Sequence, residues 1–134
     1  MSRTIATVAQ FTTRIGGLVM LILGLSFWTG HLASLVPLHR ILGFVLVIAL
    51  WTLATIALRA GAPLGQAILA FAWGFVAPAI GLMQDAILVG GLHWIVQVIH
   101  LVVGLLLIGQ AEGLARAIRP GSHAGTSSLP ARAA

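Results

Sequence analysis

Two histidines and a glutamine, His93, Gln97 and His100, stand in a segment whose other residues are almost all apolar. On an α-helix, residues seven apart complete almost two turns, so these three side chains lie on one stripe, and Gly104 follows directly below His100. Polar side chains at membrane depth are costly and by default mark a site that faces the interior of a helical bundle. Because a neutral imidazole is a metal ligand, the stripe predicts a metal or cofactor site.

A second candidate ligand, His39, begins another apolar segment, with Arg40 beside it and Gly43 one helical turn later. Two imidazoles from different helices are the usual axial pair of a b-type heme, and bundle interiors are where such cofactors bind. A porphyrin also needs flat space beside each ligand. Gly43 near His39 and Gly104 near His100 would provide this space.

Depth in the membrane leaves the ligand pair open. His39 and His93 both begin their helices, whereas His100 lies roughly 10 Å deeper than His93. If the two heme ligands must lie at the same depth, they are therefore His39 and His93. His39, His93 and His31 near the same surface, with Asp85 as a fourth ligand, would instead suit zinc or copper.

The composition places these residues in a membrane protein. The 134-residue chain is 60% hydrophobic and only 7% charged, whereas a soluble domain carries about a quarter charged residues. Four apolar stretches are long enough, at roughly 20 residues each, to cross the hydrocarbon core. We therefore expect an all-α integral membrane protein in which residues 1–118 form a four-transmembrane-helix bundle. The expected helices follow a short lead, 1–10, and cover about 11–28, 37–59, 64–83 and 92–118; 119–134 form a disordered cytoplasmic tail.

The charges predict the orientation. The net charge of +5 comes from arginines without any lysine, and these stand singly at helix ends, which does not suit nucleic-acid binding. Only Arg40 falls on the outer side of a four-pass arrangement, so the positive-inside rule places both termini in the cytoplasm. Arginine and alanine without lysine indicate a GC-rich bacterial gene and hence a bacterial inner membrane. Cysteine is absent, which excludes disulfides and thiolate metal sites.

Other residues have simpler expected roles. Glu112 is expected to pair with Arg116 one turn later, and Arg40 with Asp85, a lipid phosphate or a heme propionate. In the third helix, four small residues at helical spacing favour close packing against its neighbours: Ala70, Gly74, Ala77 and Gly81. The only two carboxylates fall at opposite membrane faces, so no acid–base pair for hydrolysis is available and no catalytic residue is assigned.

Two motifs resemble one four-helix half of heme A synthase. They are Leu38-His39-Arg40-Ile41-Leu42-Gly43 and Ile99-His100-Leu101, with a tryptophan- and glycine-bearing third helix between them. The resemblance covers about residues 35–110, roughly half the family's length, and implies heme ligation by His39 and His100. The family places a glutamate tied to heme oxidation three residues before the histidine of the His-Arg pair. Val36 stands there in this chain, so the resemblance does not extend to heme A synthesis.

The sequence thus favours a small membrane b-type cytochrome that binds heme b between the second and fourth helices. Its expected role is electron transfer or heme handling near the outer membrane face, with Gln97 as a candidate quinone contact. The alternative is a cofactor-free accessory subunit that packs on a larger respiratory or membrane complex. Expected partners are the lipid bilayer and either a quinone or such a complex, and a homo-oligomer is compatible with the sequence.

Overall fold

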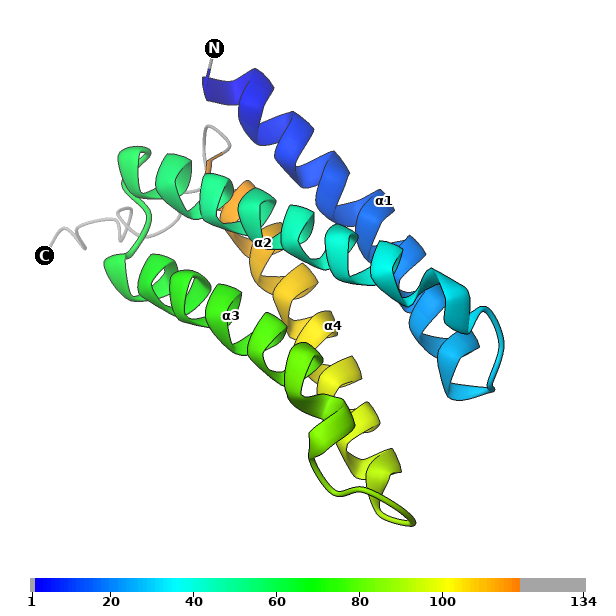
Figure 1. Cartoon of the computed structure of the whole chain (residues 1–134). Helices are drawn as coiled ribbons and strands as arrows, with labels where there is room; N and C mark the ends of the chain where they lie inside the picture. The colour runs from blue at the N-terminus through cyan, green and yellow to red at the C-terminus, as the bar shows by residue number, and fades with distance from the viewer. Residues whose placement is uncertain (1, 119–134) are drawn as a thin grey trace, which may run out of the picture.

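The protein folds into four long helices that run alternately up and down (Figure 1). The computed structural model describes residues 2–118, and the expected tail, 119–134, lies outside the described residues. The α-helices and the two short 3₁₀ turns between them are α1 (Ser2–Trp28), η1 (Ala33–Leu35), α2 (Val36–Arg59), α3 (Leu64–Met83), η2 (Gln84–Ala86) and α4 (His93–Ala117).

Each of the four α-helices is long and apolar enough to cross a membrane, which confirms the expected number and type of helices. The expected start of the first helix at about residue 11 is wrong, because α1 already begins at Ser2. Residues 2–10 contain no glycine or proline that would interrupt a helix. Ala6, Ala9 and Gln10 are also buried against the bundle, so packing extends the helix beyond the apolar stretch.

The connections define two ends of the bundle. The terminal end, as we call it, holds Ser2, the α2–α3 turn and the last residues of α4, whereas the histidine end holds the α1–α2 and α3–α4 connections (Figure 1). At the α2–α3 turn, Gly61 has a positive φ of 88°, a conformation that glycine adopts without a steric penalty. Pro63 then precedes the first residue of α3. The glycine and proline thus explain why a helix ends and another restarts within four residues.

The core is built from leucines and small residues rather than from large aromatic side chains. Leu50, Leu53 and Leu114 are completely buried, and so are several alanines. The small-residue stripe on α3 packs inward as expected: Ala70, Gly74 and Ala77 are buried. The close approach is tightest at Gly74, where the indole of Trp51 on α2 lies in the place that a Cβ would occupy. The indole N–H of Trp51 donates to the carbonyl oxygen of Phe71, 3.3 Å away.

The outer surface of the bundle is apolar. Large hydrophobic side chains are exposed along all four helices, among them Phe11, Ile48, Phe75 and Leu105. A water-soluble monomer rarely exposes an apolar surface of such extent. In a membrane, these side chains would contact hydrocarbon and not water. The apolar surface therefore supports the same conclusion as the lengths and compositions of the helices, namely that they could span a membrane.

Candidate functional site

His39 and His100 lie close together at the histidine end. His39 is in the first turn of α2 and His100 is the eighth residue of α4, and their ring centroids are 6.3 Å apart with an interplanar angle of 52°. Phe27 of α1 meets the other side of His39, edge to face, with centroids 5.3 Å apart. The fold thus brings together two imidazoles that are 61 positions apart in the chain.

Neither of these rings forms a hydrogen bond within residues 2–118. The Nδ1 atom of each ring is buried and has no partner. Buried polar atoms are nearly always paired, and an unpaired one costs about 1–3 kcal/mol. The two neighbouring rings therefore carry an unmet hydrogen-bonding capacity inside the bundle.

A cavity of about 410 Å³ adjoins the two rings and is lined by residues of all four helices. Its volume falls within the range of roughly 300–1,000 Å³ typical of sites for small molecules and cofactors. It contains every residue of the predicted site: His39, Arg40, Gly43, His93, Gln97, His100 and Gly104. The helical stripe and the second-helix motif, which the sequence treats separately, thus line one space.

Five glycines are among the residues that line the cavity, and four of them lie near the two histidines or along the predicted stripes. A Cβ at Gly104 would meet nothing within 4 Å, and one at Gly43 would touch only the methyl group of Met20 at 3.4 Å. Gly24 on α1 and Gly81 on α3 also line the cavity, and their Cα atoms face Cε1 of His39 and Cε1 of His100, respectively. Sequence reasoning did not assign these two glycines to the site, since each lies on a helix without a candidate ligand. Two features of the sequence could have pointed to them: Gly24 lies seven residues before His31, and Gly81 ends the stripe of small residues on the third helix.

His93 does not join this pair, although it lines the same cavity. Its Nδ1 lies 3.3 Å from the carbonyl oxygen of Ile87, in the connection before α4, a distance at which a protonated Nδ1 donates a hydrogen bond. The depth argument fails because it assumed that α2 and α4 begin at the same level. Instead, the first turns of α4 extend past the start of α2, which brings His100 level with His39.

The charged residues of the histidine end form one loose pair. Nη2 of Arg40 lies 3.6 Å from Oδ2 of Asp85, and both side chains are largely exposed. Arg40 therefore pairs with Asp85, one of the three partners expected for it. Both residues line the cavity, so the guanidinium is also within reach of a ligand there.

The alternative zinc or copper site is not formed. Among the described residues 2–118, no three histidine or acidic side chains come together as metal ligands. His31 is exposed, and its Nδ1 lies 3.1 Å from the hydroxyl of Thr29.

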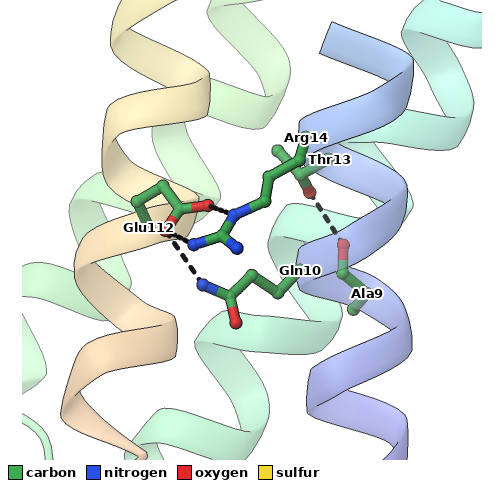
Figure 2. A network of polar contacts seen from close by, with 5 residues as sticks. All are labelled: Ala9, Gln10, Thr13, Arg14 and Glu112. Atoms are coloured by element: carbon green, nitrogen blue, oxygen red, sulfur yellow. Dashed lines mark hydrogen bonds and ion pairs between the residues drawn. The ribbon is translucent and has the colours of Figure 1, made fainter.

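A second polar cluster occupies the terminal end and corrects a sequence-based expectation (Figure 2). Glu112 of α4 accepts two hydrogen bonds from Arg14 of α1, over 2.6 and 2.8 Å, and a third from Nε2 of Gln10 over 2.9 Å. The expected partner within α4, Arg116, forms no ion pair with it within the 4 Å limit. Glu112 pairs with Arg14 because this guanidinium can donate two parallel hydrogen bonds to the carboxylate, whose shape it matches.

Comparisons with protein-family models, with curated proteins and with solved structures find no match to this chain. The resemblance to one half of heme A synthase therefore remains an expectation from the two short motifs.

Proposed function

We propose that the protein is a membrane-embedded b-type cytochrome in which His39 and His100 are the axial ligands of one heme. The proposal depends above all on one observation: two imidazoles from separate helices lie 6.3 Å apart, without hydrogen-bond partners for their Nδ1 atoms, and both line one cavity. The membrane in question is the bacterial inner membrane, crossed four times with both termini in the cytoplasm. The histidine end is then the outer end of the bundle.

The spacing of the rings suits a single metal ion between them. A bond from a metal to an imidazole nitrogen is about 2 Å long. The ring centre lies roughly 1 Å behind that nitrogen, so two imidazoles on one ion have centroids about 6 Å apart. The observed 6.3 Å agrees with this value. No hydrogen bond joins the two rings within residues 2–118, so their proximity is not explained by a direct contact between their nitrogens.

The surroundings of the rings suit a flat macrocycle. The cavity wall is mainly apolar, with glycines, aliphatic side chains and aromatic rings such as that of Phe27, so it offers apolar contacts to a flat group. Arg40 at the mouth is positioned to bind an anionic substituent such as a propionate carboxylate, in exchange for the loose contact to Asp85. When bound, a heme supplies a one-electron couple whose potential the ligands and nearby charges tune. The residues of this chain would hold the group, exclude water from its apolar faces and neutralise its acidic edge.

The experiment compares the heme spectra of the wild type and of four single variants. Purified wild-type protein, expressed with an ample heme supply, should show a Soret band, split α and β bands on reduction, and one heme per chain by pyridine hemochrome assay. His39→Ala and His100→Ala should each abolish the low-spin spectrum, because each removes one axial ligand. His31→Ala is the control and should retain it, since that imidazole is exposed at the same end.

The His93→Ala variant separates the two possible ligand pairs. Retention of the low-spin spectrum supports His39 with His100, whereas its loss, with retention in His100→Ala, would assign the iron to His93. Colourless wild-type protein under these conditions would overturn the proposal. Co-purification of that colourless protein with a larger membrane complex would favour the accessory-subunit alternative.

A further inference from the structure

A groove at the terminal end joins α1 to α4 and is lined by arginine. It has a volume of about 290 Å³, and its polar lining comes entirely from α1: Arg3, Thr7, Gln10 and Arg14. These positions follow one another at intervals of three or four residues, so they form a single polar stripe on the helix. The stripe spans twelve residues, or roughly 16 Å along the axis.

The charge of the groove is positive. The guanidinium of Arg14 is held by Glu112, which compensates its charge. No carboxylate pairs with Arg3 within the described part of the chain, 2–118. Two guanidiniums thus line one groove, and one of them is uncompensated, so the groove suits an anion.

The surface beside the groove is strongly apolar. Ile5, Val8 and Phe11 on α1 are exposed by 45–64%, and they occupy the same three turns as the polar stripe. A molecule that satisfies both surfaces needs an anionic head and a hydrocarbon tail. Basic grooves between helices at the cytoplasmic side of a membrane are known binding places for the head groups of acidic phospholipids.

We infer that this groove binds the phosphate head group of an anionic phospholipid, with Arg3 as the phosphate contact and Thr7 beside it. The ion pair between Arg14 and Glu112 fixes α1 against α4 and so maintains the groove. The inference depends on the membrane embedding proposed above, but not on heme binding, because the two sites lie at opposite ends of the bundle.

The test measures the melting temperature in mild detergent with added lipid, together with lipid retention by native mass spectrometry. Phosphatidylglycerol should raise the melting temperature of the wild type by several degrees more than phosphatidylcholine does, and it should remain bound as one adduct per chain. Arg3→Gln should remove at least half of this difference. Arg59→Gln is the matched control and should keep it, since Arg59 is exposed at the same end but outside the groove.

Three outcomes would overturn the inference. In the first, both lipids raise the melting temperature of the wild type equally. In the second, Arg3→Gln and Arg59→Gln reduce the difference between the two lipids by the same amount. The third is full stabilisation by soluble glycerol phosphate, which would assign the groove to a free phosphate. The Soret band, recorded on the same samples, tests the heme proposal separately, because a colourless protein can still respond to phosphatidylglycerol and a heme-loaded one can fail to.

Discussion

The imidazole of His100 lies directly against the backbone of Gly81, so that a Cβ built at position 81 would be only 2.8 Å from Cε1 of the ring. Gly24 stands in a similar relation to His39, but there the corresponding distance is 3.8 Å, an ordinary van der Waals contact. Helices α1 and α3 thus provide the backbone surfaces beside the rings of His39 and His100. This difference in distance gives a matched pair of substitutions.

We predict that Gly81→Ala displaces the His100 ring, whereas Gly24→Ala leaves the His39 ring in place. In a heme-loaded protein, Gly81→Ala should change the low-spin electron paramagnetic resonance signal and lower heme occupancy several-fold. Gly24→Ala should resemble the wild type in both measurements. Identical spectra for the two variants would show that Gly81 does not position the ligand.

Charge at the mouth of the cavity should tune the reduction potential in opposite directions. A positive charge favours the reduced iron, so Arg40→Gln should lower the midpoint potential, and Asp85→Asn should raise it by removing the compensating carboxylate. At an effective dielectric constant near 20, one charge at about 10 Å corresponds to tens of millivolts. Spectroelectrochemical titration measures both shifts, and shifts of the same sign would contradict the assignment.

The contact between Trp51 and Gly74 should control the stability of the bundle. Gly74→Ala places a methyl group where the indole now lies, which should destabilise the fold by about 1–3 kcal/mol through overpacking. Gly65→Ala on the same helix is the control, since a Cβ there would meet nothing within 4 Å. The free energy of unfolding in detergent, from chemical denaturation, distinguishes the two. Equal stability of both variants would mean that α2 and α3 can separate at this point without cost.

Glu112 should stabilise the bundle through its ion pair with Arg14 of α1, and not through Arg116 on its own helix. Glu112→Ala should lower the melting temperature, because it leaves the guanidinium of Arg14 and the amide of Gln10 without their carboxylate. Arg116→Gln should change it little. The exchange variant Arg14→Glu with Glu112→Arg should recover part of the loss. No recovery, with an equal effect of Arg116→Gln, would assign the stabilisation to the contact within α4.

The sequence alone determined the architecture of the protein. Long uncharged stretches, bounded by single charges and by a Gly-Ala-Pro turn, predict four apolar helices, each long enough to cross a membrane. The same reasoning identified the stripe of His93, Gln97 and His100, because helical periodicity is a local property. All three residues line the cavity.

The tertiary structure decided which residues meet. The relative level of α2 and α4 depends on the lengths of the connections and on the packing of small residues, neither of which periodicity specifies; this offset selects His100 over His93 as the neighbour of His39. Glu112 likewise pairs with Arg14 and not with the expected Arg116, because a bidentate contact across helices competes with one along the helix. Gly24 and Gly81 gained their role only from what lies opposite them. A sequence records which side chains share a face of one helix, but which faces meet follows from packing between helices.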